Sequence, residues 1–98
     1  MRIELVYFED CPNWKLAHAR VRAALAAVGR PDAAVHLHLV RSPAEAEAAG
    51  MHGSPTILVD GRDPFAPSDS AVWSCRLYPG EKGLEGAPSL ADLVAALR

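Results

Sequence analysis

The chain lacks the features that mark several large classes of protein. No stretch is strongly basic and the formal net charge is −2 at pH 7, so nucleic acid is not an expected partner. No apolar run is long enough to span a membrane, and the first residues read as a strand rather than as a signal peptide. The sequence therefore predicts a cytoplasmic protein with no membrane partner.

Cysteine is also scarce, since Cys11 and Cys75 are the two in 98 residues. Structural disulfides are rare in the cytoplasm, so these cysteines are expected to be reactive, metal-binding or simply buried. The length suits one small domain, 1–98, with one core. No internal repeat, low-complexity tract or linker divides the chain.

What the chain does contain is an alternation of strand and helix patterns. Helices are predicted to begin at Pro12, after Ser42 and after Ser89, because Pro suits a first helical turn and Ser is a preferred N-cap. Asp60-Gly61 is a strong signal for a tight turn. Alternating or β-branched apolar residues predict strands at 2–8, 35–40 and 56–59.

Residues 72–78 are predicted to form a fourth strand, antiparallel to 56–59, whereas 79–88 are predicted to be loop. The first three strands are joined through helices and are expected to be parallel. The predicted order is strand, helix, strand, helix, strand, strand, helix. This order predicts an α/β fold of three layers with a four-stranded mixed sheet.

Cys11 lies where the first strand gives way to the first helix. A helix N-terminus presents unpaired N–H groups and a partial positive charge, which favour a thiolate over a thiol. The thiolate is the nucleophile, so this position predicts a reactive cysteine. Glu9 and Asp10 oppose the effect if they lie close, because they repel a like charge. The alternative is that Cys11 is unreactive, a formerly catalytic cysteine on a fold that now serves another purpose.

Two short motifs give the chain a resemblance to the thioredoxin-like superfamily. The run Cys11-Pro12-Asn13-Trp14 resembles the CxxC or CxxS motif that starts the first helix in that family. The run Gly53-Ser54-Pro55-Thr56 resembles the segment whose cis-proline faces that motif. The closing run Cys75-Arg76-Leu77-Tyr78 is similar to the C-R-L-Y segment of small bacterial thioredoxin-like proteins, some of which are named alkylmercury-lyase-like.

The resemblance implies a thioredoxin-like domain with a cis bond before Pro55, an isomer that only X–Pro bonds adopt cheaply. It also implies that Ser54 and Pro55 hold the backbone of a peptide or of glutathione, unless this segment is a purely structural turn. The chain departs from the family at Trp14, which stands where thioredoxins have the resolving cysteine. Cys11 therefore acts alone, or Cys75 resolves it from elsewhere in the fold.

The remaining candidates have more than one interpretation. Trp14 either belongs to the core or lines a substrate groove with Pro12, and Cys75 is either the partner thiol or a small core residue. His36 and His38 lack further metal ligands and are expected on an exposed strand face. The carboxylates of 60–69 lack calcium-loop spacing and are expected to be solvated. No metal and no cofactor are predicted.

Three functions fit these residues. The first is a thiol–disulfide oxidoreductase or thiol-transfer protein, in which Cys11 attacks a protein or low-molecular-weight disulfide and Cys75 or glutathione resolves the intermediate. The second is a non-enzymatic thioredoxin-like binding module, favoured by the missing resolving cysteine. The third is soft-metal or organomercurial binding through the thiolates of Cys11 and Cys75.

Overall fold

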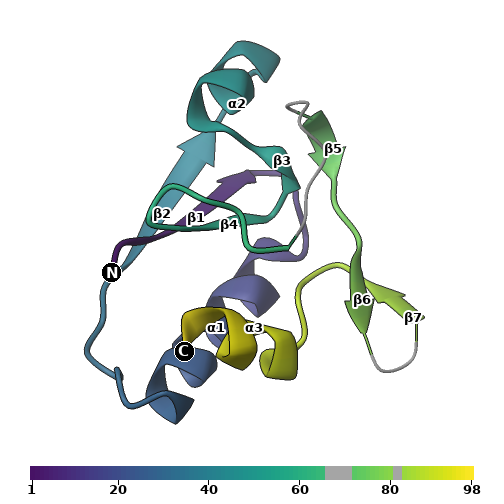
Figure 1. The fold of residues 1–98 in the computed structure, drawn as a ribbon. Coiled ribbons are helices and arrows are strands. Elements are labelled where there is room, and N and C mark those ends of the chain that lie inside the picture. The colour runs from purple at the N-terminus through teal and green to yellow at the C-terminus, as the bar shows by residue number, and fades with distance from the viewer. Residues whose placement is uncertain (66–71, 81–82) are drawn as a thin grey trace.

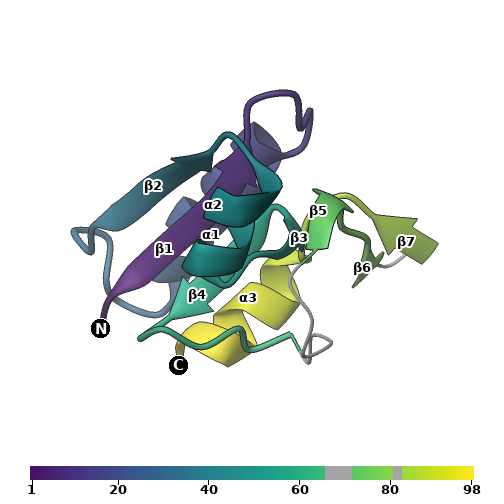
Figure 2. The same ribbon diagram turned by 90° about the horizontal axis from the view of Figure 1, so that it is seen from above.

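The computed structural model describes residues 1–65, 72–80 and 83–98, without the side chains of 72–74. The helices are α1 (Trp14–Ala27), α2 (Pro43–Ala49) and α3 (Leu90–Leu97). Figures 1 and 2 show α2 on one side of the central strands and the pair α1 and α3 on the other. The strands are β1 (Ile3–Phe8), β2 (Val35–Val40), β3 (His52–Ser54), β4 (Thr56–Val59), β5 (Val72–Cys75), β6 (Tyr78–Gly80) and β7 (Gly83–Glu85).

The central sheet has the order β2-β1-β4, with β1 parallel to β2 and antiparallel to β4. The expectation that 56–59 runs parallel to the first strand is therefore wrong. The reason is the length of α2, whose seven residues span only about 10 Å. A six-residue strand such as β1 is about 20 Å long, so α2 cannot return the chain to the start of the sheet. The chain enters β4 at the end where β1 finishes.

The predicted fourth strand does not join this sheet. Among the described residues, β5 pairs in parallel with β3, with Ser54 opposite Cys75, and the central sheet holds β2, β1 and β4. The four-stranded mixed sheet is therefore wrong, and so is the thioredoxin-like three-layer sandwich built on it. Val59, the last residue of β4, donates its N–H to the carbonyl of Arg62 (2.7 Å). The turn after β4 therefore takes up a backbone hydrogen bond that a further strand would need at this position.

The predicted loop at 79–88 contains another difference. The predicted strand 72–78 is divided, because β5 ends at Cys75 and Tyr78 begins β6. The strand β6 pairs with β7 in an antiparallel hairpin. This hairpin projects away from the central sheet in Figures 1 and 2. It replaces part of the loop that the Gly-rich sequence predicted.

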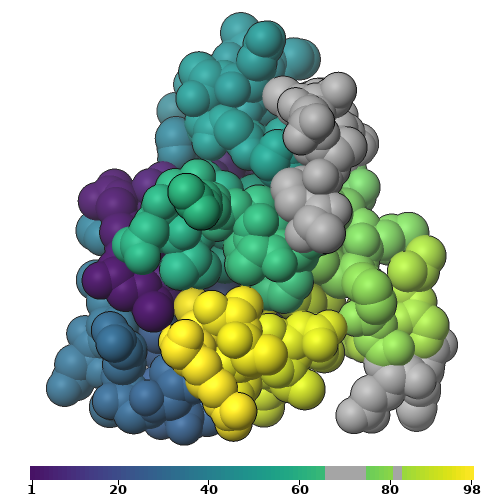
Figure 3. Space-filling model, in the orientation of Figure 1, coloured from purple at the N-terminus to yellow at the C-terminus, as the bar shows by residue number. Residues whose placement is uncertain are grey.

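Two hydrophobic clusters lie on opposite faces of β1, because successive side chains of a strand point to opposite sides. Ile3 and Leu5 pack with α1 and α3, whereas Val6 packs with α2 and Met51. Figure 3 shows α3, in yellow, directly against the segment that contains β4. Both faces of β1 are therefore covered.

The local signals for α2, α3 and the turn after β4 are also confirmed. The Oγ atoms of Ser42 and Ser89 each accept a backbone N–H of the first helical turn, both at 3.1 Å. Asp60 and Gly61 both have positive φ, as the tight turn requires. Over the described ranges, none of the helices is long and apolar enough to cross a bilayer.

Candidate thiol site

Cys11 lies in the turn between β1 and α1 rather than in the helix. Its N–H donates to the carbonyl of Phe8 (3.0 Å), and α1 begins at Trp14 with Asn13 as N-cap. The predicted helix start at Pro12 is therefore two residues early. The field of a helix terminus falls off within the first turn, so α1 acts on this sulfur less than the sequence suggested.

The side chain of Cys11 is buried, with 2% of the residue exposed. Its thiol donates to the carbonyl of Ser54, with 3.5 Å between Sγ and O. Phe8 donates its N–H to Ser54 Oγ (3.2 Å), so β1 and the Ser54 segment together enclose this sulfur. Cys11 is thus covered by its own chain and closed to a large substrate.

The bond between Ser54 and Pro55 is cis, which confirms the prediction. Gly53, which precedes it, has a φ of 99°, a conformation that favours glycine over other residues. The carbonyl of Ser54 accepts the N–H of Arg76 (3.0 Å) as well as the Cys11 thiol. The role of Ser54 and Pro55 in holding a substrate backbone remains a prediction.

The pairing of β3 with β5 brings Cys75 to Cys11. Both are free thiols, and Cys75 is exposed, which excludes the core alternative for this residue. Partial burial raises the pKa of the Cys75 thiol, and Cys11 raises it further through its charge and a side-chain hydrogen bond. The fold therefore brings two thiols that are 64 positions apart in sequence to the same residue, Ser54.

Trp14 and Pro12 differ in their surroundings. Trp14 is partly buried against the core between β1 and α1, and its ring stacks on Tyr7 with 4.4 Å between centroids and 20° between planes. Pro12 is exposed. These contacts favour the core interpretation of Trp14, whereas a substrate contact at the exposed Pro12 remains a prediction.

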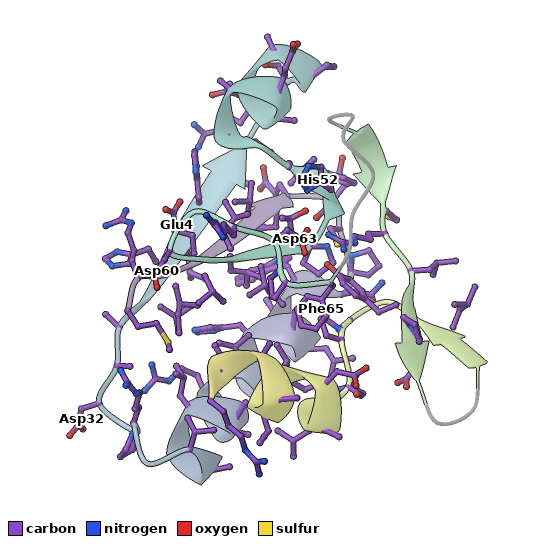
Figure 4. The ribbon with its side chains drawn as sticks, in the orientation of Figure 1. Glu4, Asp32, His52, Asp60, Asp63 and Phe65 are labelled. Carbon is purple, nitrogen blue, oxygen red and sulfur yellow. The ribbon has the colours of Figure 1, made fainter. Side chains whose placement is uncertain are left out.

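A buried charged cluster that the sequence did not predict lies next to Cys75 in the chain. The Asp63 side chain is 1% exposed and is bound by both terminal nitrogens of Arg76. His52 Nδ1 lies 3.3 Å from Asp63 Oδ2, and Figure 4 shows the two side chains close together. The expectation that the carboxylates of 60–69 are solvated is wrong for Asp63; Asp69 lies outside the described residues.

Tyr78 connects this cluster to the cis-proline. Its hydroxyl donates to the carbonyl of Pro55, and its ring lies under the guanidinium of Arg76, 4.4 Å from ring centroid to Cζ. Burial raises the pKa of Tyr78, which keeps the hydroxyl protonated and able to donate. The signal in the sequence was the run Cys75 to Tyr78, which places an arginine between apolar residues and beside a cysteine.

The histidines on the second strand remain apart from this site. His36 and His38 are exposed, as predicted, and His38 Nδ1 lies 4.0 Å from a carboxylate oxygen of Glu4. No group of three or more His, Cys, Asp or Glu side chains suited to a metal ion occurs in the part of the chain that the structure describes.

Comparison with known proteins gives no relative: no family model, no curated protein and no solved structure matches this chain.

Proposed function

We propose that this protein is a thiol–disulfide oxidoreductase whose redox pair is Cys11 and Cys75. The observation that carries the proposal is that both cysteines meet at Ser54: the Cys11 thiol donates to its carbonyl, with 3.5 Å between Sγ and O, and Cys75 faces Ser54 in the pairing of β3 with β5. The resemblance of the Cys11-Pro12 and Ser54-Pro55 motifs to those of thioredoxin-like proteins supports the same chemistry. In this proposal Cys75 supplies the second thiol of the pair, because Trp14 stands where thioredoxins have their second cysteine.

The reaction reduces one disulfide and oxidises the pair. One thiolate of the pair attacks a sulfur of the substrate disulfide, the substrate S–S bond breaks, and the first substrate thiolate leaves and takes up a proton. The second thiolate then attacks the mixed disulfide and forms the bond between Cys11 and Cys75. The second substrate thiol leaves, so two electrons and two protons pass to the substrate.

The substrate is a protein or low-molecular-weight disulfide, and an external thiol such as glutathione returns the pair to the reduced state. A cytoplasmic location is part of the proposal, because that compartment maintains a pool of reduced thiols. Neither a nucleic acid nor a membrane partner belongs to this cycle.

A redox titration of the pure protein, followed by intact and peptide mass spectrometry, tests the proposal. We expect a reversible loss of two hydrogen atoms from the intact mass and a peptide cross-linked between Cys11 and Cys75. The matched variants Cys11→Ser and Cys75→Ser should each abolish the cross-link and the turnover of insulin or of hydroxyethyl disulfide. If the wild type forms no cross-link, the proposal fails and the binding-module hypothesis takes its place.

The placement of Cys11 and Cys75 at the same residue, Ser54, favours soft-metal binding as a second candidate function. Two adjacent thiolates suit linear coordination of mercury(II) or copper(I). Titration with mercury(II) should then release thiol protons at one equivalent, and each single cysteine variant should bind more weakly. Equal affinity in the double variant Cys11→Ser, Cys75→Ser would remove this candidate.

A further inference from the structure

We propose that the exchange begins at Cys75 and that Cys11 is the resolving thiol, which reverses the order that the sequence predicts. The inference rests on the proposed function and assigns a separate step to each cysteine. It follows from the unequal access to the two sulfurs and from the contacts that both cysteines make with Ser54.

Access favours Cys75. A thiolate that displaces a thiol must approach along the axis of the S–S bond, so the substrate must bring both of its sulfurs to the attacking atom. Cys11 is 2% exposed and lies under the Ser54 segment, whereas Cys75 is exposed. Leu77, two residues beyond Cys75, is 60% exposed, while the Arg76 side chain between them is 11% exposed. Cys75 and Leu77 are thus both open to solvent, on either side of the buried Arg76 side chain.

Ser54 fixes the position of Cys11 relative to Cys75. A thiol has one proton, and that of Cys11 is directed to the carbonyl of Ser54. Ser54 is also the residue that faces Cys75 in the pairing of β3 with β5, so Cys11 and Cys75 meet at the same residue. Cys11 is thus held beside Cys75, whose sulfur a resolving thiolate must attack.

The second step needs no movement of a large group into the buried site. After Cys75 has displaced the first substrate thiol, its sulfur carries the mixed disulfide while Cys11 remains beside it. Cys11 loses its proton, attacks Cys75 Sγ and releases the second substrate thiolate, which takes up a proton. An intramolecular attack between positioned atoms has a large advantage in effective concentration.

The test measures the rate at which each thiol forms its first mixed disulfide. Folded Cys11→Ser and Cys75→Ser are mixed with Ellman's reagent, and in parallel with glutathione disulfide, under pseudo-first-order conditions. We expect Cys11→Ser to form a stable adduct on Cys75 in both reactions. Cys75→Ser should react at about one tenth of the Cys11→Ser rate or more slowly still, because Cys11 must first be exposed by local opening of the fold. In urea the two variants should react at similar rates, which controls for unequal intrinsic reactivity.

A measurement on the wild type avoids any effect of substitution on the fold. Acid quenching within the first turnover, followed by peptide mapping, should find the first adduct on Cys75. An adduct that appears first on Cys11, or a Cys75→Ser variant that reacts as fast as Cys11→Ser, would overturn the proposed order. Absence of an internal disulfide in the wild type defeats the proposed function instead, while the two labelling rates still decide which thiol is open.

Discussion

At Cys75, an exposed side chain and a raised pKa act on reactivity in opposite directions. Exposure admits the substrate, whereas the raised pKa lowers the fraction of thiolate at neutral pH. The thiolate that does form is intrinsically more nucleophilic, since nucleophilicity rises with pKa. Reaction at Cys75 should therefore be slow near pH 7 and should accelerate as the pH rises.

Replacement of Cys11 should move that pH profile. Because Cys11 contributes a charge and a hydrogen bond to the raised pKa of Cys75, Cys11→Ala should shift the profile toward lower pH. The part of the shift that comes from burial should remain. The measurement is the rate of iodoacetamide alkylation of the Cys75 peptide between pH 6 and about pH 10, the range that brackets a thiol pKa. Cys11→Ser, which keeps a hydrogen-bonding group, should lie closer to the wild type, and identical profiles in all three proteins would contradict the thiol contact.

Tyr78 gives a second prediction for a single residue. In Tyr78→Phe the buried carbonyl of Pro55 loses the hydroxyl that donates to it, which should lower the free energy of unfolding by about 1–3 kcal/mol. The folded state raises the pKa of Tyr78, so the protonated form is stabilised. This contribution is complete below the unfolded pKa, near pH 10, and declines as the pH rises toward the folded value.

The stability difference between wild type and Tyr78→Phe should therefore shrink above about pH 10. Urea unfolding at a series of pH values measures it. Tyr7→Phe is the matched control, because it keeps the ring that stacks on Trp14 and should cost much less. A difference that grows with pH would show that the hydroxyl does not stabilise the fold as a donor.

Between elements, the ion pair of Asp63 with Arg76 links the turn after β4 to the end of β5. Arg76 also donates its N–H to the Ser54 carbonyl and a guanidinium N–H to the carbonyl of Phe65 (3.3 Å). Removing one partner of a buried pair leaves an uncompensated charge. Asp63→Asn or Arg76→Met should therefore lower the free energy of unfolding by about 3–5 kcal/mol.

The double variant Asp63→Asn, Arg76→Met should cost less than the sum of the two single changes, because no charge is then left alone. Urea unfolding of the four proteins gives the coupling free energy. The exposed Arg41→Met controls for loss of an arginine as such and should change stability by about 0.5 kcal/mol or less. Additive costs in the double variant would mean that the pair does not hold β5 in place.

Local features of these elements could be predicted from the sequence, whereas the direction and the pairing of the strands could not. The helix caps were predictable because Ser42 and Ser89 each bond an N–H three residues further along the chain. The turn was predictable because it depends on the backbone of Asp60 and Gly61 themselves. The direction of β4 depends on whether a short helix can cross the sheet, which periodicity does not report. The pairing of β5 with β3 depends on contacts such as Arg76 with Ser54, whose residues lie far apart in the chain.

The candidate site shows the same division. Cys11 and the cis bond at Pro55 could be proposed from neighbouring residues, and the cis bond is confirmed. Whether Cys75 reaches Cys11 could not be decided, because the register of β5 against β3 determines it. The burial of Asp63 was also hidden, since its partner Arg76 comes from another element and the surrounding loop reads as polar.

At the scale of the whole molecule, the proposed disulfide would join the turn before α1 to the end of β5 and close a loop over most of the chain. In the chain-entropy model a cross-link of this kind stabilises the native state by about 3–5 kcal/mol, because it restricts the unfolded ensemble more than the folded one. Both cysteines already meet at Ser54 in the reduced fold, so the bond requires little rearrangement of the elements that carry them. The oxidised protein should therefore unfold at a higher temperature and a higher urea concentration than the reduced protein.

The comparison also predicts a property of the redox cycle, because the folding equilibrium and the redox equilibrium share one thermodynamic cycle. If oxidation stabilises the fold, folding favours the disulfide by the same free energy, and the native pair is harder to reduce than the same cysteines in urea. Unfolding of both redox forms, with the Cys11→Ser, Cys75→Ser double variant in oxidant and in reductant as control, measures this free energy. An oxidised form less stable than the reduced one would mean that the bond strains the fold, and the pair would then act as an oxidant toward its substrates rather than as a reductant.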